Sequence, residues 1–512
     1  MAPLKTFTRE EVSRHAAEND LWIIIDGSVY DMSVFIDMHP GGAFPILEFA
    51  GKDATDAFYG LHRQEVLLKY NRYKIGTIAG EKPQIEFREA GSLTKVPYGE
   101  PSAWMGFRSP YYTESHIKFR TAVRKIVDEL MPEAQELENA GGRIPDEFQQ
   151  KLGETGLLAA NIGPGKWLRD FNVQLPGGIS PEEYDYFHET IVHEEMARMG
   201  AKGTVTGLTG GMTISVPSII NFASEALKAK VIPPVLAGKK RMALAITEPY
   251  AGSDVARIRT TAKRTPCGKF FIINGVKKWI TTGHFADYFS TAVRTDKGIS
   301  MILVERSEGL ETKPIKTSYA STAGTAYVTF DNVKVPVENM LGEEGKGMYY
   351  VLSNFNHERW SMIVGACMAG RLAVEECFKW AMQRKVFGKR LIDQPVIRNK
   401  LAKMIAAVES VQSWTDNITY QMCHMDYSEQ ANKLAGPIAL CKYQVTRMLH
   451  DVSDDACQIF GGRAITQTGM GRNIEALQRT YKFTAILGGS EEIMADLGVR
   501  QAMKKFPTDA RL

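Results

Sequence analysis

The sequence predicts a multidomain protein in which a small α+β domain precedes a helical region, a β-rich middle region and a second helical region. A chain of 512 residues is too long for one ordinary core. Helical periodicity marks stretches such as Ser115–Leu130 and Pro181–Arg198, whereas short apolar runs with turn signals mark the first and third regions. The positions at which the sequence changes between these two patterns give the predicted order of domains.

Domain boundaries are placed where the composition changes along the chain. The stretch that follows the first domain is polar and rich in Pro and Gly, which is typical of a linker. The predicted segments are 4–79 for the first domain, 80–107 for the linker, 108–240 for the first helical domain, 241–345 for the β domain, 346–505 for the second helical domain and 506–512 for a tail.

Two dipeptides carry the strongest turn signals in the β regions. Asp26-Gly27 follows the apolar run Leu21–Ile25, a pattern typical of a tight turn between antiparallel strands. Asn274-Gly275 separates Phe270–Ile273 from Val276–Ile280 in the same manner. We therefore expect a hairpin at each of these positions.

The composition excludes several broad classes of protein. The net charge is only +3, from 62 basic and 59 acidic residues, so no general attraction to nucleic acid or to an anionic membrane is expected. No apolar run approaches the roughly 20 residues that a transmembrane helix needs. The 6 cysteines form no Cys-x-x-Cys pair and are predicted to be reduced residues of an intracellular protein.

The two ends of the sequence bear on localisation. Residues Met1–Asp20 include four acidic residues and lack an apolar segment, which argues against a signal peptide or a mitochondrial presequence. The last three residues, Ala510-Arg511-Leu512, match a relaxed form of the peroxisomal Ser-Lys-Leu signal. We therefore predict a peroxisomal protein, with the cytoplasm as the other compartment and mitochondria not favoured.

His39-Pro40-Gly41-Gly42 and the later His62 are the first candidates for chemistry. Two neutral imidazoles on opposite sides of an iron can hold a haem, and glycines let the backbone turn closely beside the ring. Seen alone, His39 could equally cap a turn and His62 could be a surface histidine. Together with Gly51–Phe58, these residues resemble the signature of the cytochrome b5 family over about 75 residues. The resemblance implies haem b, with His39 and His62 as axial ligands, and electron transfer as the role of this domain.

A second set of motifs occurs in order over residues 110–505. The motifs are Thr247-Glu248-Pro249 with Gly252-Ser253-Asp254, Lys278-Trp279-Ile280-Thr281, Arg384-Lys385-Val386-Phe387-Gly388 and Gln458-Ile459-Phe460-Gly461-Gly462. Each of them alone is an ordinary strand, turn or helix segment, but together they resemble the acyl-CoA dehydrogenase family. The resemblance implies a helical domain, a β-barrel-like middle domain and a four-helix bundle, with FAD as cofactor and an acyl-CoA as substrate.

The resemblance also assigns residues to the FAD site. Thr247, Ser253, Trp279, Thr281 and Ser490 are expected to contact the cofactor, with Thr281 near flavin N5. The matching positions that a neighbouring subunit contributes in this family are Arg384, Phe387, Gln458 and Gly462. A homo-oligomer, dimer or tetramer, is therefore implied. Val386 stands where many relatives have a hydroxyl residue, so one FAD hydrogen bond is expected to be weaker.

The catalytic base must be a carboxylate that removes the C2 proton while C3 loses a hydride to the flavin. Most of the family has this glutamate in a C-terminal turn where the chain has Gly488. Glu358 lies on an apolar helical stripe with Val351, Phe355 and Met362, where a carboxylate is costly unless it is paired or functional. A salt bridge to an arginine is the other explanation of its place there.

Glu358-Arg359 resembles the base position of family members that act on long-chain or branched acyl groups. We therefore predict Glu358 as the base, Arg359 as a supporting contact and the backbone N–H of Gly488 as a donor to the thioester oxygen. Glu491 and Glu492 are the nearest rival carboxylates and are expected to begin the next helix.

The predicted function is FAD-dependent α,β-desaturation of a medium-chain, long-chain or branched acyl-CoA, as in fatty acid β-oxidation. Electrons then leave the flavin, either to the fused haem or to another acceptor that the sequence does not name. Two alternatives remain: a flavin oxidase or monooxygenase, such as a nitroalkane oxidase, and a haem electron-transfer module on a degenerate dehydrogenase scaffold. A nitroalkane oxidase would need its carboxylate at the position of Gly488, and a degenerate scaffold should have lost its FAD and base residues together.

Overall fold

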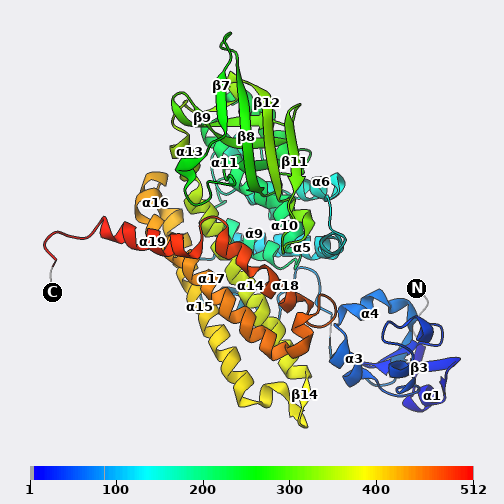
Figure 1. Ribbon diagram of the computed structural model, residues 1–512. Coiled ribbons are helices and arrows are strands. Elements are labelled where there is room, and N and C mark those ends of the chain that lie inside the picture. Colours follow the sequence, from blue (N-terminus) through cyan, green and yellow to red (C-terminus); the bar gives the residue numbers. More distant parts are fainter. Residues whose placement is uncertain (1–4, 86, 511–512) are drawn as a thin grey trace. The chain divides into compact units, whose positions relative to one another are not determined.

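The computed structural model describes residues 5–85 and 87–510 of the chain (Figure 1). Arg511 and Leu512 of the tripeptide that was predicted as a peroxisomal signal lie outside the described residues, as does Leu4 at the start of the predicted first domain. The chain divides into two compact units, and each is described by itself. Unit 1 contains residues 1–89, 376–400 and 456–476, and unit 2 contains residues 90–375, 401–455 and 477–512.

A five-stranded sheet organises the amino-terminal part of unit 1, with the order β1-β5-β4-β3-β2. The strands are β1 (Lys5–Phe7), β2 (Ala16–Ala17), β3 (Asp20–Ile25), β4 (Ser28–Asp31) and β5 (Lys74–Ile78). Asp26 and Gly27 turn between β3 and β4 with positive φ angles of 52° and 70°. The predicted hairpin at Asp26-Gly27 is therefore confirmed, because both central residues of such a turn need positive φ.

Four short helices cover this sheet and carry the residues around the two histidines. They are α1 (Arg9–Ser13), α2 (Phe44–Leu47), α3 (Thr55–Leu61) and α4 (Glu65–Lys69). Apolar side chains of α2, α3 and α4 form one core with the strands, in which Leu21, Ile23, Tyr30, Phe35 and Tyr59 are buried. Val12 of α1 belongs to a second core with Ile24, Val29 and Ile78. The residue that follows His62, Arg63, donates to both carboxylate oxygens of Glu376 at 2.6 and 2.7 Å within the same unit.

The first part of unit 2 is helical, as predicted. Its main helices are α5 (Glu114–Ala140), α9 (Tyr186–Ala197), α11 (Gly211–Phe222) and α12 (Glu225–Leu236). Between α10 (Lys202–Val205) and α11 the chain forms a π-helical turn at Thr206–Gly210. Such turns are rare and frequent at functional sites.

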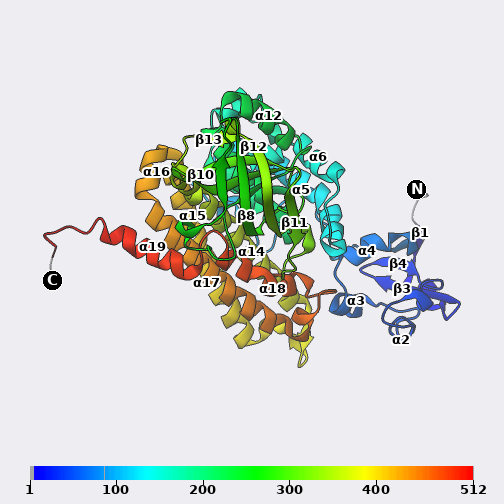
Figure 2. The ribbon, with the colours of Figure 1, turned by 45° about the horizontal axis from the view of Figure 1, so that its top comes forward.

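An eight-stranded sheet forms the middle domain (Figure 2). Seven of its strands follow the order β11-β12-β8-β7-β9-β10-β13, and the eighth, β6, pairs with β9. The strands are β6 (Met242–Ala245), β7 (Thr261–Arg264), β8 (Phe270–Ile280), β9 (Tyr288–Thr295), β10 (Gly298–Glu305), β11 (Leu310–Pro314), β12 (Ala326–Pro336) and β13 (Met340–Leu341). A buried apolar core lies under these strands.

The hairpin predicted at Asn274-Gly275 is wrong. Both residues lie inside the continuous strand β8, which pairs with β12 on both sides of a register shift between Phe330 and Val333. Gly275 has a φ of 150°, and a Cβ there would lie 2.5 Å from the Thr260 hydroxyl oxygen. Glycine is needed here for a bulge and a close approach, not for a chain reversal.

The carboxyl-terminal region is a helical bundle. Its helices are α13 (Gly347–Ser353), α14 (Phe355–Gln383), α15 (Pro395–His424), α16 (Tyr427–Lys433), α17 (Ala435–Phe460), α18 (Arg472–Ile486) and α19 (Glu491–Met503). Side-chain contacts within unit 2 join its members: the Trp360 indole donates to Thr419 at 2.9 Å, and Lys442 on α17 reaches the end of α18. None of the described helices is long and apolar enough to cross a membrane.

Candidate functional site

A cavity of about 220 Å³ in unit 2 brings two of the predicted site residues together. Thr281 comes from the end of β8 in the middle domain, and Glu358 comes from the first turn of α14 in the bundle. The π-helical turn at Thr206–Gly210 and the end of α18 complete much of the wall. Residues that are far apart in the sequence thus line one cavity, which is the arrangement of a ligand site.

Glu358 is only 7% exposed, and burial raises the pKa of its carboxyl group above the ordinary value. The charges of Arg359, Lys442 and His357 oppose this shift. A carboxylate whose pKa is raised by burial is a stronger base than an ordinary exposed one. The environment of Glu358 therefore suits proton abstraction.

Gly488 lies beside this carboxylate. Its φ is +64°, and a Cβ there would lie 2.8 Å from Met362 Sδ and 3.4 Å from Glu358 Oε1. A side chain at position 488 would therefore strain the backbone and compete with Glu358 for space. The absence of a side chain at Gly488 therefore leaves room for the carboxylate of Glu358 on α14.

Two cations fix the turn that contains Gly488. Arg359 Nε donates to the Gly488 carbonyl at 3.1 Å. Lys442 Nζ donates to the carbonyl oxygens of Thr484, Leu487 and Gly489 at 3.3, 2.7 and 2.7 Å. Burial lowers the pKa of the Lys442 ammonium to about 8. With its three N–H groups engaged by one turn, Lys442 is a positioning residue for the Gly488 backbone.

Sequence reasoning missed Lys442, although a signal was present. Lys442 lies on the apolar stripe of α17 with Ile438, Val445 and Leu449, all of which are buried. A charged residue on such a stripe is costly without partners, which is the argument that had singled out Glu358. The apolar periodicity of α17 could therefore have predicted a buried Lys442, but not the carbonyl groups that it contacts.

The residues expected at the flavin edge lie on two adjoining segments. Lys278 N donates to Thr247 O at 2.8 Å, which brings Thr247 beside Trp279 and Thr281. A buried pair, Lys277 Nζ and Glu248 Oε1 at 2.8 Å, supports the same junction. These three site residues are therefore brought together.

Trp279 has a φ of 64° and is 49% exposed. A bulky residue in this conformation is strained, and such strain clusters at ligand sites. Ser253 lies on an exposed turn, and Thr281 lines the cavity. Thr247 and Thr281, the hydroxyl residues on the two adjoining segments, would supply hydrogen-bonding groups that suit a flavin. Ser490 begins α19, and its hydroxyl makes no capping hydrogen bond there.

The residues assigned to a neighbouring subunit's cofactor lie in unit 1. Phe387 is 95% exposed at the tip of the hairpin formed by β14 (Lys385–Val386) and β15 (Lys389–Arg390), with a φ of 49°. Gln458 and Gly462 are exposed at the end of α17, and Arg384 precedes the hairpin. An almost wholly exposed phenylalanine in a strained turn is unusual unless something covers it.

The rings of the two predicted haem ligands lie close to each other in unit 1. His39 follows a 3-10 turn at Ile36–Met38, and His62 caps the end of α3. Their ring centroids are 6.0 Å apart. An imidazole nitrogen binds a metal at about 2 Å, so two rings on opposite sides of one ion have centroids about 6 Å apart. The spacing fits an iron between them.

Local contacts prepare both rings for this role. His39 Nδ1 lies 2.8 Å from the Gly42 carbonyl oxygen, which favours a proton on Nδ1 and leaves Nε2 for a metal. A Cβ at Gly41 would lie 2.9 Å from His39 Cε1, so glycine is required there. Burial, and then the neighbouring His39, lower the pKa of His62 and favour its neutral form. The apolar side chains of Phe44 and Leu61 remain exposed nearby in sequence.

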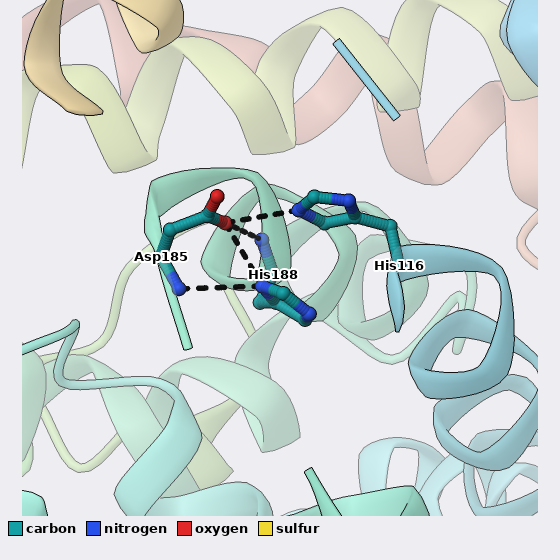
Figure 3. Close-up of side chains that lie close together, drawn as sticks. All are labelled: His116, Asp185 and His188. Carbon is teal, nitrogen blue, oxygen red and sulfur yellow. Dashed lines mark hydrogen bonds and ion pairs between the residues drawn. The ribbon is translucent and has the colours of Figure 1, made fainter. Parts of the chain in front are cut away.

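A second cluster, of His116, Asp185 and His188, has the residue types of a metal site (Figure 3). Asp185 Oδ1 lies 3.1 Å from His116 Nε2 and 2.9 Å from His188 Nδ1, and it accepts the N–H of Phe187 at 2.9 Å. Asp185 is the N-cap of α9, and both histidines support it. The cluster is satisfied as a helix cap, and we assign no metal to it.

Helix α9 in turn supports the segment that carries Glu358. Glu189 Oε1 lies 3.1 Å from His193 Nε2 and 2.8 Å from His357 Nε2. The Glu189 carboxylate raises the pKa of His357 against the effect of burial. His193 also lines the cavity. His357 therefore anchors α14 to α9 and leaves its neighbour Glu358 to the cavity.

Four family models match the chain in order. They are described as a cytochrome b5-like heme/steroid binding domain at residues 8–79 and as the acyl-CoA dehydrogenase N-terminal, middle and C-terminal domains at residues 113–239, 243–333 and 345–503. The three dehydrogenase models cover the helical, sheet and bundle regions of the fold.

Individual proteins show the same similarity. The acyl-CoA dehydrogenase apdG of Emericella nidulans is 39% identical over 82% of this chain and 98% of its own length. The mitochondrial long-chain specific acyl-CoA dehydrogenase of Sus scrofa is 30% identical over 83% of this chain and 92% of its own. A crystal structure of an acyl-CoA dehydrogenase from Bacillus anthracis complexed with FAD matches with a TM-score of 0.67 and 28% identity, over 78% of this chain and 69% of that one.

Proposed function

The chain belongs to the acyl-CoA dehydrogenase family and carries a cytochrome b5-like domain, and on this basis we propose that Glu358 is the base of an FAD-dependent α,β-desaturation of an acyl-CoA thioester. The enzyme is an oxidoreductase with FAD and haem as its cofactors. The observation that carries the proposal is the shared cavity of Glu358 and Thr281, next to the turn of Gly488.

In this proposal the C2 proton of the thioester moves to the Glu358 carboxylate, C3 gives up a hydride, and a C2–C3 double bond forms. FAD, when bound, is the hydride acceptor. The Gly488 N–H donates to the thioester oxygen and stabilises the charge that develops there. Arg359 and Lys442 hold this N–H in place through the carbonyls of the same turn.

The first test is an anaerobic titration of the purified enzyme with long-chain and branched acyl-CoAs, followed by visible absorption. We expect flavin absorption to bleach as acyl-CoA is added, together with a haem Soret band. A flavin that no acyl-CoA bleaches would contradict the proposal and would favour other substrates of the same fold, such as nitroalkanes. The position of the base argues against nitroalkane oxidation, since Gly488 lacks the carboxylate.

We further propose that the haem of this chain is the exit for the electrons of the reaction, one at a time. Two histidine ligands leave no position on an iron for oxygen, so the domain suits electron transfer only. Arg63, which follows His62, is ion-paired to Glu376 in unit 1, and Asn473 also donates to Glu376 at 3.2 Å. These contacts connect the haem segment to the segments that carry Arg384 and Gln458.

A homo-oligomer is part of the same proposal. Arg384, Phe387, Gln458 and Gly462 would complete the FAD site of a second copy of the chain, and the 95% exposure of Phe387 supports this role. Acyl chains of medium or long length, or branched chains, and a place in fatty acid β-oxidation are proposed from the position of Glu358 on α14.

Flavin reduction is expected to depend on pH through Glu358. Only the ionised carboxylate accepts a proton, and its pKa is raised by burial, so the rate should fall as pH drops through a value above that of an ordinary glutamate. Single-turnover reduction measured across the acid range checks this. An acid limb at the ordinary carboxyl pKa, or none at all, would argue for another base.

Lys442→Met is expected to lower the rate of flavin reduction about a hundredfold, because the turn that presents Gly488 N–H loses its three hydrogen bonds. The acid limb of the pH profile should also move to higher pH, since the Lys442 charge lowers the pKa of Glu358. Lys433→Met, which breaks only an exposed pair with Glu429, is the matched control. A slower enzyme with an unmoved acid limb would mean that Lys442 is merely structural.

A further inference from the structure

The cavity beside Glu358 contains a lysine that the proposed reaction does not use. Lys202 lines the wall together with Thr206 and Thr209 of the π-helical turn. Met362, Ala366 and Leu449 contribute an apolar part of the same wall. A pocket that takes only an alkyl chain is lined mainly by apolar groups, so a cation in this wall requires a reason.

The surroundings of Lys202 leave its charge largely without a partner. Its Nζ lies 3.4 Å from Thr480 Oγ1, which is a long hydrogen bond. Within residues 5–85 and 87–510, no carboxylate lies within 4.0 Å of it. Glu138 is the nearby acid, but its carboxylate accepts the N–H groups of Gly203 and Thr204 at 3.1 and 2.7 Å. An ammonium has three donors, so most of its capacity remains for a ligand.

Burial lowers the pKa of Lys202 to about 8, while the charge of Glu138 acts in the opposite direction. The side chain is half-buried and remains mostly protonated at neutral pH. A buried charge that lacks an ion pair is costly, and a bound anion would remove that cost and restore the pKa.

Helix α18 extends from the contact with Lys202 to the turn beside Glu358. Thr480, which contacts Lys202, is followed on the same face by Thr484 and Leu487, both of which line the cavity. The turn then reaches Gly488 beside Glu358 Oε1. At 1.5 Å per residue, the stretch from Thr480 to Leu487 spans about 10 Å. A ligand along this wall would meet the base at one end and the ammonium some carbon atoms away.

We propose that Lys202 binds a carboxylate at the far end of the acyl chain, so that the preferred substrates are ω-carboxyacyl-CoAs, the mono-thioesters of dicarboxylic acids. The inference rests on the proposed function and names its substrate class. Glu358 acts on C2 of such a thioester, the apolar wall holds the methylene groups and Lys202 pairs with the terminal carboxylate.

The test compares matched substrates on the full-length enzyme with its FAD bound. Adipyl-, suberyl- and sebacyl-CoA are titrated against hexanoyl-, octanoyl- and decanoyl-CoA, and half-saturation and the limiting rate of flavin bleaching are measured separately. At least one dicarboxylic thioester should saturate at about ten- to a hundredfold lower concentration than its monocarboxylic partner. Lys202→Met should abolish this preference, and Lys202→Arg should retain most of it. Lys151→Met, which changes an exposed lysine paired with Glu133, should keep it fully.

The outcomes separate the two proposals. If no thioester of either series bleaches the flavin, the proposed function itself fails. If monocarboxylic thioesters bleach it and no dicarboxylic partner is preferred, or if Lys202→Met leaves the preference intact, the role of Lys202 is overturned while the function stands. Loss of FAD from Lys202→Met would also overturn it, because the lysine would then serve the cofactor.

Discussion

Glu358→Gln is expected to lower the rate of flavin reduction by acyl-CoA about a thousandfold, or about 4 kcal/mol in activation free energy. The glutamine has the same shape and cannot accept the C2 proton. Because Glu358 is buried and its ionised form is disfavoured there, a neutral amide should not destabilise the fold. Stopped-flow absorption under anaerobic conditions measures the rate directly.

The controls for this variant are the rival carboxylates. Glu491→Gln and Glu492→Gln change residues in the first turn of α19, where acidic groups suit the helix N-terminus. In both variants we expect acyl-CoA to reduce the flavin at nearly the original rate. If Glu491→Gln or Glu492→Gln stops the reaction while Glu358→Gln does not, the base has been assigned to the wrong carboxylate. Retained flavin absorption in all three variants shows that FAD binding is intact.

Replacing both His39 and His62 by alanine is expected to remove the haem completely, because both neighbouring imidazole rings are lost. The Soret band should disappear from the purified protein. Bleaching of the flavin by acyl-CoA should remain, since the cavity of Glu358 lies wholly in unit 2. Turnover with a haem-linked acceptor such as cytochrome c should then be lost.

His15→Ala is the matched control for the haem variant. His15 lies in the same domain, stacks on Trp22 and contacts Asp20, and it is not one of the two predicted haem ligands. It should retain the Soret band and full turnover. Unchanged turnover in the variant without haem would contradict the proposal that electrons leave through this domain, while a retained Soret band would contradict the ligand assignment.

Two glycines with the same sequence signal have different roles in the fold. Asp26-Gly27 and Asn274-Gly275 have the same turn signature, yet only the first reverses the chain. Gly275 is needed because Thr260 of a different segment approaches the backbone closely. Such a dipeptide indicates that the backbone can adopt unusual φ angles. Whether the chain then turns or only lets another segment come close depends on residues that are distant in the sequence.

The sequence alone determined the features that depend on local pattern and on ordered motifs: the two histidines predicted to hold the haem, with their glycines, the order of helical and sheet regions, and a carboxylate on an apolar stripe at Glu358. The tertiary structure decided which groups share one space. Lys442 at the turn of Gly488 and Lys202 in the cavity wall gain their importance from partners about 40 and 280 residues away, at Thr484 and Thr480. Periodicity along one helix can mark a buried charge, but only the packing of several elements determines what that charge contacts.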